Sequence, residues 1–289
     1  MEYDATNDAL TKPETRLPLA VDDQWSLAAR CAELSRLAYF RAELDAGAAA
    51  QVAAGLAAAG YGPATSFRGD AILPKRSIGT YAFAVRDGAG RAFVVFRGTQ
   101  PDDLGDLIDD VRFWPKDLHN GVKVHGGFLR AYNSLKGDID AWLAALDPQP
   151  AELIVTGHSL GAAMATLMAS LNCDATLVTF GSPRVGGPGL AQMFAGRPVH
   201  RYVDCNDFVT NLAPPIWFRH VAGMHYIDRH GVVRDKPPGL WQRALDRVRG
   251  DFAYFRRFGI RSGHVPFRTA ADHAPINYVA AVLGVRVGP

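Results

Sequence analysis

Apolar positions along this chain follow two kinds of pattern. Residues 23–60 and 127–145 repeat apolar side chains every third or fourth position, which predicts two helices that meet near residue 38 and then one long helix. Shorter runs rich in β-branched or aromatic residues predict strands at 78–85, 91–96, 153–156, 175–180 and 199–203. A glycine-containing turn at 87–90 joins the first two strands as a hairpin. Strands that alternate with helices predict one α/β domain over residues 23–289, with a mostly parallel sheet between helical layers.

Composition adds several exclusions to this picture. With 48% hydrophobic residues among 289 and a net charge of +2, the chain can bury a large core and gives no reason to expect nucleic-acid binding. No run approaches the ~18 apolar residues of a membrane span. The three cysteines are too scattered for a disulfide framework or a metal site. Residues 1–22 are polar and predict a disordered tail rather than a secretory signal, so we expect a cytoplasmic protein, with secretion of a processed form as the alternative.

One pentapeptide contains a candidate nucleophile. Ser159 lies in the G-x-S-x-G sequence at 157–161, which follows the predicted strand at 153–156 and precedes a run of helix formers at 162–169. Strand, sharp turn and helix are the context in which such a serine is exposed for nucleophilic attack. The flanking glycines suit this turn because side chains there would make the strand and the helix collide. We expect the backbone N–H of Leu160, at the start of the helix, to stabilise the oxyanion.

A nucleophilic serine needs a base and a carboxylate that orients the base, and both are expected after Ser159 in the chain. The predicted strand at 199–203 ends just before Asp204 and Asp207. Catalytic residues follow the carboxyl ends of parallel strands, so these two are the acid candidates. Five histidines lie further along, and sequence patterns alone do not rank them as the base: His220, His225, His230, His264 and His273.

An ordered series of motifs surrounds the pentapeptide. In chain order the motifs are FRGT at 96–99, VHGGF at 124–128, FGSPRVG at 180–186, NDFV at 206–209 before a proline pair, and Asp272-His273 followed by Tyr278. Over roughly residues 25–285 this series resembles the class 3 lipases, the fungal-type triacylglycerol lipases and their bacterial relatives. The resemblance implies an α/β-hydrolase fold.

The resemblance also implies roles for particular residues. Asp207 matches the acid of the family's D-x-V-P segment, and His273 matches the base of its C-terminal D-H segment. Thr99 matches the second oxyanion donor, through its backbone N–H and its hydroxyl. Thr210 stands where the family usually has proline, a change that affects the stiffness of the loop more than the chemistry. The resemblance implies no metal and no organic cofactor.

Residues 101–111 predict an acidic amphipathic helix at the place where the family has its lid, which we expect at about 100–118. Such a lid would lift to expose an apolar stripe to lipid aggregates; the alternative is a fixed helix packed on the core. By resemblance, Asp110 matches the lid aspartate that steadies the oxyanion hydroxyl. Leu107 stands for the family's tryptophan, which weighs against strong interfacial activation.

A second unusual segment is a basic helical insertion at about 234–262. It contains eight Arg or Lys residues against three Asp residues, and its apolar side chains recur at roughly helical spacing. We expect a helix that packs over the core with a solvated basic face. Transient contact with an anionic lipid surface is the alternative.

Together these features predict a serine ester hydrolase that cleaves acylglycerols or related carboxylic esters through an acyl-enzyme on Ser159. Alternatives in the same class are a phospholipase A1, a feruloyl-type esterase or an acyltransferase. A different class is a hydrolase-like scaffold that binds a ligand without turnover. The expected partner is therefore an ester or lipid substrate.

Overall fold

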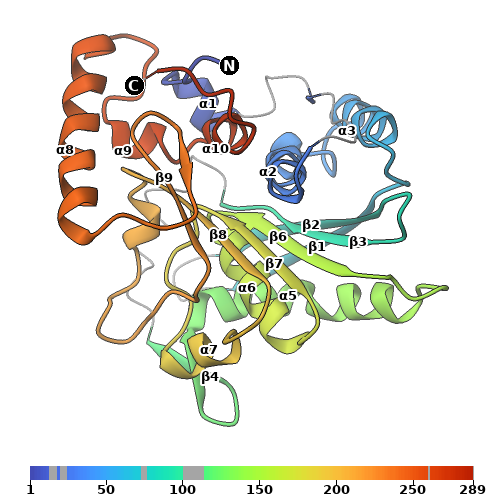
Figure 1. Ribbon diagram of the computed structural model, residues 1–289. Coiled ribbons are helices and arrows are strands. Elements are labelled where there is room, and N and C mark those ends of the chain that lie inside the picture. The colour runs from blue at the N-terminus through green and yellow to red at the C-terminus, as the bar shows by residue number, and fades with distance from the viewer. Residues whose placement is uncertain (13–17, 20–24, 73–76, 100–113, 260, 289) are drawn as a thin grey trace.

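The computed structural model describes residues 1–12, 18–19, 25–72, 77–99, 114–259 and 261–288 (Figure 1). The helices are α1 (Asn7–Thr11), α2 (Leu27–Leu37), α3 (Ala46–Ala58), α5 (Gly126–Ala144), α6 (Leu160–Leu171), α7 (Pro188–Met193), α8 (Leu240–Arg257), α9 (Arg268–Ala271) and α10 (Pro275–Val282), with short 3-10 helices at Ala38–Phe40 and Val209–Asn211. The strands are β1 (Thr65–Ile72), β2 (Ser77–Arg86), β3 (Ala92–Phe96), β4 (Pro115–His119), β5 (Val122–His125), β6 (Leu153–His158), β7 (Thr176–Phe180), β8 (Val199–Asp204), β9 (Met224–Ile227) and β10 (Val233–Arg234).

The eight-stranded sheet has the order β1-β2-β3-β6-β7-β8-β9-β10, and β4 and β5 form a separate hairpin. Its five middle strands, β3 to β9 in that order, pair in parallel. The strands at both edges pair antiparallel. A parallel middle sheet requires crossover connections, and helices supply them. The predicted mostly parallel sheet is therefore confirmed.

Helices cover both faces of this sheet (Figure 1). On one face α5 and α6 pack against the strands, and on the other face α2 does so, with α10 against α2. The strand residues alternate between these two layers. In β3, Val94 and Phe96 join the core under α5 and α6, whereas Phe93 and Val95 join the core under α2 and α10. A strand buried on both faces shows no polar alternation, which explains the uninterrupted apolar run in the sequence.

Most predicted elements are present. The apolar stripe predicted on the long helix is largely buried in α5, through Phe128, Tyr132, Leu135 and Ile139. The break predicted near residue 38 is the 3-10 helix Ala38–Phe40 between α2 and α3. The hairpin at 87–90 joins β2 to β3 in antiparallel register. Strand β1 was not predicted, because its exposed and polar positions give only a weak strand pattern in the sequence.

The first twelve residues differ from the disordered tail that the sequence predicts over 1–22. Tyr3, Ala5 and Ala9 are buried, and α1 begins after Thr6, whose side chain accepts a hydrogen bond from the N–H of Ala9. Tyr3 packs against residues near the other end of the chain, and its hydroxyl donates to Asp272 Oδ1 at 2.6 Å. Asp272 lies 269 positions from Tyr3 in the chain, so the local composition of this segment could not reveal the contact.

Among the described residues, no helix combines the length and the apolar character that crossing a membrane requires.

Candidate active site

The candidate nucleophile lies at a strained turn between β6 and α6. Ser159 has φ +58° and ψ −127°, a backbone conformation that residues other than glycine rarely adopt. At this turn the backbone of the pentapeptide packs closely against β3 and against the start of α6. A Cβ at Gly161 would lie 2.1 Å from the carbonyl oxygen of Phe96, and one at Gly157 would lie 2.5 Å from the carbonyl oxygen of Gly161. The glycines of the pentapeptide therefore let α6 start directly against β3 and β6.

Asp207 and His273 are brought together from the loop after β8 and the segment between α9 and α10. His273 Nδ1 lies 2.8 Å from Asp207 Oδ2, and both side chains are buried. The same carboxylate also accepts the hydroxyl of Tyr278 at 2.6 Å and, on Oδ1, the N–H of Val209 at 2.8 Å. Three donors thus fix the orientation of the Asp207 carboxylate.

Tyr278 is suited to donate to that carboxylate. Burial, and then the negative charge of Asp207, raise the pKa of the Tyr278 hydroxyl well above its ordinary value, so the hydroxyl keeps its proton. The Tyr278 oxygen in turn accepts the backbone N–H of Asp204 at 3.1 Å. Tyr278 therefore connects the end of β8 to the acid of the site.

Ser159 Oγ and His273 Nε2 are both buried, and neither has a hydrogen-bond partner among the described residues. The two residues lie in the same part of the molecule. His158 is next to Ser159 in the chain, and the centroid of its ring lies 4.5 Å from that of the His273 ring. Buried polar atoms are normally hydrogen-bonded, and exceptions concentrate at reactive groups. The two free atoms are those that must exchange a proton in serine catalysis.

His158 contacts both the ring and the backbone of His273. Burial, and then the proximity of His273, lower the pKa of His158 well below its usual value, so the ring is neutral. Its Nε2 lies 2.9 Å from the carbonyl oxygen of His273, which can only accept, so Nε2 carries the proton. Its Nδ1 then accepts the hydroxyl of Tyr39 at 2.8 Å. This chain of hydrogen bonds holds the backbone of His273 in place.

Thr99 and Leu160, the two residues expected to bind the oxyanion, line one small cavity. Its volume is about 20 Å³, and Gly98 and Met164 also contribute to it. A space of this size accommodates a single water-sized atom. The Thr99 hydroxyl oxygen is buried with no hydrogen-bond partner among the described residues, and Leu160 is the first residue of α6, where backbone N–H groups have no intrahelical acceptor.

Asp204, the other acid candidate, belongs to a buried network of charges. Its carboxylate pairs with Arg286, and Arg286 also approaches Asp272, which pairs with Arg268 at 3.1 Å. Burial raises the pKa of Asp272, but Arg268 and Arg286 together outweigh burial and lower it, so the carboxylate stays charged. This network fixes the residue that precedes His273.

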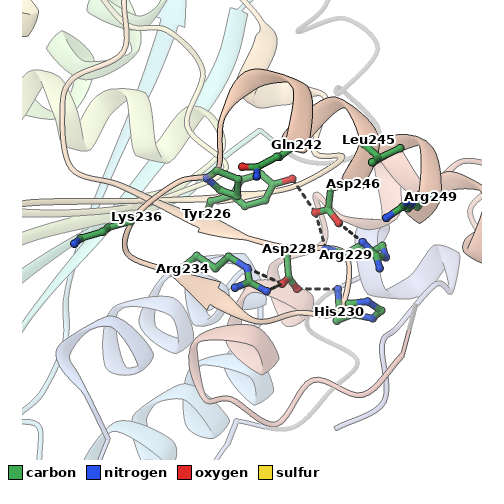
Figure 2. A pocket seen from close by; sticks show the side chains of 11 residues that line it. Tyr226, Asp228, Arg229, His230, Arg234, Lys236, Gln242, Leu245, Asp246 and Arg249 are labelled. Carbon is green, nitrogen blue, oxygen red and sulfur yellow. Dashed lines mark hydrogen bonds and ion pairs between the residues drawn. The ribbon is translucent and has the colours of Figure 1, made fainter.

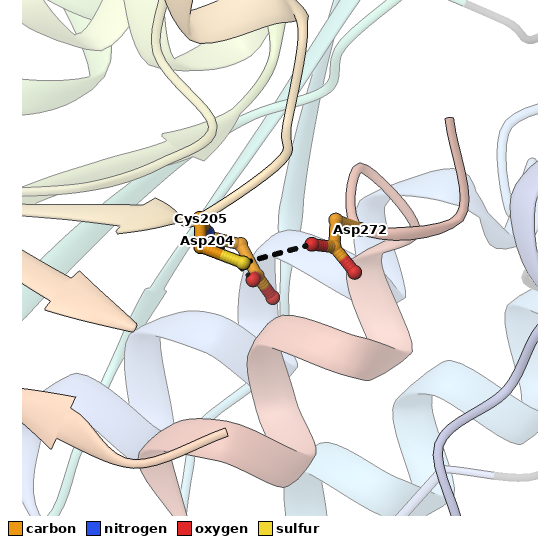
Figure 3. Close-up of side chains that lie close together, drawn as sticks. All are labelled: Asp204, Cys205 and Asp272. Atoms are coloured by element: carbon orange, nitrogen blue, oxygen red, sulfur yellow. Dashed lines mark hydrogen bonds between the residues drawn. The ribbon is translucent and has the colours of Figure 1, made fainter. Parts of the chain in front are cut away.

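Figure 3 shows that Asp204, Cys205 and Asp272 point toward one another, with ligand atoms within 4.8 Å. Carboxylate and thiolate atoms at this spacing are a geometric candidate for a cation. Arginine guanidinium groups already occupy the acceptor positions of both carboxylates. Burial, and then Asp272, raise the pKa of the Cys205 thiol well above its ordinary value, so it is a poor metal ligand. The group therefore fits an ion-pair network and does not fit a metal.

The remaining sequence-based candidates lie elsewhere. His220 Nε2 lies 2.9 Å from the carbonyl oxygen of Thr210, and His225 Nδ1 lies 2.8 Å from Asp235 Oδ1. Thr210 itself donates its hydroxyl to the carbonyl oxygen of Asp207 at 2.8 Å, a bond that the family's proline could not make. Asp110 and most of the expected lid, residues 100–113, lie outside the described residues, while residues 115–118 belong to β4.

The sequence did not indicate roles for Tyr39, His158 and Tyr278, although His158 lies in the pentapeptide and Tyr278 follows the Asp272-His273 motif. Their contacts join residues 71 to 119 positions apart. No local pattern signals such contacts.

Comparison with known proteins supports the resemblance that the sequence motifs indicate. Residues 93–217 match the family model described as lipase (class 3). Over this region the chain resembles the class 3 lipases. It is 34% identical over 179 residues to the secreted mono- and diacylglycerol lipase 1 of Fusarium solani, covering 58% of this chain and 53% of that protein. It is 32% identical over 202 residues to a lipase of Rhizomucor miehei, covering 65% of this chain and 52% of that protein.

The chain spans about half the length of the curated relatives it matches. A solved structure covers more of it. The crystal structure of the lipase from Rhizopus microsporus var. chinensis covers 79% of this chain and 82% of that one, at 25% identity and a TM-score of 0.54. The α/β-hydrolase fold implied by the sequence motifs is therefore confirmed.

Proposed function

We propose that this protein is a serine ester hydrolase that cleaves acylglycerols or related carboxylic esters. The observation that carries the proposal is the buried group of Ser159, His273 and Asp207. His273 Nδ1 lies 2.8 Å from Asp207 Oδ2. Ser159 Oγ and His273 Nε2 have no hydrogen-bond partner among the described residues. The names of the Fusarium and Rhizomucor relatives, which are lipases, support the same chemistry and an acylglycerol substrate.

In the proposed reaction, Ser159 Oγ attacks the ester carbonyl carbon while His273 Nε2 takes the hydroxyl proton. The negative charge that forms on the carbonyl oxygen is stabilised by the N–H of Leu160 and by Thr99, which line one cavity. The carbon–oxygen bond to the alcohol then breaks, and His273 gives its proton to the departing alcohol. Water attacks the acyl-enzyme by the same route and releases the carboxylic acid and free Ser159.

Asp207 orients the His273 ring and stabilises its positive charge during both steps. Tyr278 and the N–H of Val209 hold the carboxylate in the required position through hydrogen bonds of 2.6 and 2.8 Å. Asp110 is proposed to support Thr99 from the lid, as the resemblance implies.

The proposal is tested with p-nitrophenyl esters of increasing chain length and with an emulsified triacylglycerol. The wild-type chain should hydrolyse these esters, and Ser159→Ala should lower kcat/KM by roughly a thousandfold or more without a change in circular dichroism. Undiminished turnover by Ser159→Ala would contradict the mechanism. Absence of turnover on every ester by the folded wild-type chain would favour a binding scaffold.

The cellular location belongs to the same proposal. The cytoplasmic location predicted from the polar segment 1–22 gains no support from the comparisons, and the Fusarium relative is secreted according to its name. We propose secretion for this chain, and assaying the medium and the cell extract of the source cells for the enzyme tests it.

A further inference from the structure

Helix α8 turns its polar face toward the protein. The buried residues of this helix are Asp246, Gly250 and Tyr254, which follow one another at four-residue spacing. Asp246 accepts hydrogen bonds from the Tyr226 hydroxyl at 2.9 Å and from Arg229 at 2.7 Å. This is the reverse of an ordinary surface helix, whose apolar face covers the core. The structure differs from the expected helix because its large apolar side chains are exposed, and not only its basic ones.

The outward face of α8 is apolar. Its five large side chains recur every three or four residues and form one stripe: Trp241, Leu245, Val248, Phe252 and Phe255. Trp241 is 90% exposed, and Val248, Phe252 and Phe255 are each more than 60% exposed. Isolated exposed apolar residues are common, but a continuous stripe on one helix marks an interaction surface. In Figure 1, α8 lies at the outside of the molecule, with one flank open along its length.

A positively charged pocket lies beside this stripe. Its volume is about 520 Å³, and Leu245 and Arg249 of α8 form part of its wall. The two carboxylates in the wall are already paired, Asp228 with Arg234 at 2.6 Å and Asp246 with Arg229 at 2.7 Å. Lys236 and Arg249, which lie at opposite ends of the group in Figure 2, have no acidic partner among the described residues. The pocket therefore has two cations available for an anionic group.

We propose that α8 docks on the surface of an anionic phospholipid bilayer, with the aromatic stripe among the acyl chains and a lipid phosphate in the adjacent pocket. A stripe next to unpaired cations matches the chemistry of such a surface, where apolar chains lie directly below phosphates. This surface is separate from the Ser159 site, so it stands independently of the proposed hydrolysis.

Charge distinguishes a bilayer from a second copy of the chain. Helix α8 contains five arginines and two aspartates. Asp246 is held by Tyr226 and Arg229, and Asp251 accepts a hydrogen bond from Asn206 at 2.6 Å. Arg249 and Arg256 are exposed along one edge of the stripe. Two copies of this face would bring like charges together, whereas a phosphate-rich surface neutralises them.

The polar face of α8 contacts the loop that contains Asp207. Arg247 Nε donates to the carbonyl oxygen of Cys205 at 2.6 Å, and Asn206 donates to Asp251. Cys205 and Asn206 directly precede Asp207 in the chain. The helix is therefore anchored to the candidate active site by its polar face while its apolar face remains free.

The test is co-sedimentation of the full chain with vesicles, in a Ser159→Ala background that prevents lipid hydrolysis. Vesicles of phosphatidylcholine alone are compared with vesicles that also contain phosphatidylglycerol. We expect binding to the anionic vesicles only, a blue shift of tryptophan emission on binding, and weakening as salt is raised. The Trp241→Ser, Phe252→Ser variant and the Lys236→Gln, Arg249→Gln variant should each bind roughly tenfold more weakly or worse.

Matched controls separate docking from general loss of surface charge or apolar area. Leu44→Ser, Ile72→Ser removes two apolar side chains that are 70% and 77% exposed elsewhere, and Lys116→Gln, Lys136→Gln removes two distant positive charges. Both controls should bind like the parent chain. With Ser159 restored, the α8 variants should keep normal turnover of a soluble short-chain ester, which shows that they are folded.

Four results would overturn the proposal. Equal binding to neutral and anionic vesicles would exclude the role of the pocket, and equal losses in the controls would exclude α8 as the surface. A wild-type dimer that Trp241→Ser, Phe252→Ser converts to a monomer, without any vesicle binding, would assign the stripe to a second copy. Binding of inorganic phosphate without vesicle binding would likewise exclude a bilayer.

Discussion

Asp207 is held by more donors than any sequence motif indicates. The ring of His273, the hydroxyl of Tyr278 and the N–H of Val209 all donate to its two carboxylate oxygens. Hydrogen bonds to a charged carboxylate contribute about 1.5–3 kcal/mol each. Because His273 and Tyr278 share Oδ2, loss of the tyrosine hydroxyl would let the carboxylate rotate away from the histidine.

Tyr278→Phe should therefore lower kcat about tenfold and leave KM nearly unchanged, since the hydroxyl acts on Asp207 and not on the substrate. Steady-state kinetics on a soluble ester measure both constants, and thermal unfolding shows whether the fold is retained. Unchanged kcat in a folded Tyr278→Phe variant would show that the other donors suffice to hold Asp207.

The sequence predicts the acid and the base of the site only in part. Strand patterns left Asp204 and Asp207 as equal candidates, and the resemblance to class 3 lipases separated them. In the structure Asp207 contacts His273, and Asp204 pairs with Arg286. The contributions of Tyr278 and His158 could not be predicted, because they depend on side chains that approach only when the sheet and α10 have formed.

The junction of β3, β6 and α6 leaves no room for a side chain at Gly161. Gly161 faces the carbonyl oxygen of Phe96, where a Cβ would lie 2.1 Å away. This neighbour is backbone and cannot rotate aside. Any side chain at 161 must push α6 away from β3. The N–H of Leu160, the proposed oxyanion donor, would move with the helix.

Gly161→Ala should lower the free energy of unfolding by several kcal/mol and abolish most ester hydrolysis. Overpacking a well-packed core typically costs about 1–3 kcal/mol, and here the displaced group is backbone. Gly137→Ala in α5 is the matched control, because its Cβ would meet nothing within 4 Å. It should raise the free energy of unfolding by roughly 0.5–1 kcal/mol in urea denaturation. Equal stability of the two variants would refute the packing argument.

Periodicity predicted where helices and strands occur, because burial on one face leaves a repeating pattern. It did not predict which face of α8 turns inward. The pattern shows that Trp241, Leu245 and Phe252 share a face, but only contacts with distant residues such as Tyr226 and Arg229 show that the opposite face is the buried one. Strand β1 was missed for a related reason, since its outer positions are largely polar or exposed.

Across the whole molecule, the two ends of the chain meet beside the candidate site. The N–H of Tyr3 donates to Val287, and its hydroxyl donates to Asp272, the residue before His273. Arg268 and Arg286 complete this buried network. The first residues are therefore part of the support for His273, the proposed catalytic base, although their polar composition suggests a free tail.

Two histidines with lowered pKa values, His158 and the half-buried His220, predict how stability depends on pH. Burial lowers the pKa of His220 from its usual 6.5 to about 3 and lowers that of His158 well below 6.5. Below pH 6.5 the unfolded chain binds protons at both residues, whereas the folded protein does not. The free energy of unfolding should therefore fall as pH decreases from 6.5 to 4.5, by up to about 1.4 kcal/mol per pH unit for each histidine.

Urea denaturation at several pH values measures this slope. His220→Gln keeps a donor for the carbonyl oxygen of Thr210 and removes one titrating group, so its slope over this range should be about one proton smaller. A slope identical to that of the parent chain would contradict the lowered pKa of His220.

The central claim is that Ser159 is a nucleophile activated by His273 and Asp207. Mass spectrometry after treatment with a fluorophosphonate tests it most directly, since this reagent reacts far faster with an activated serine than with an ordinary one. We predict one adduct per chain, on the peptide that contains Ser159. The adduct should be absent in Ser159→Ala and should form far more slowly in His273→Ala. An adduct on another serine, in a chain that hydrolyses esters equally well after Ser159→Ala, would contradict the claim.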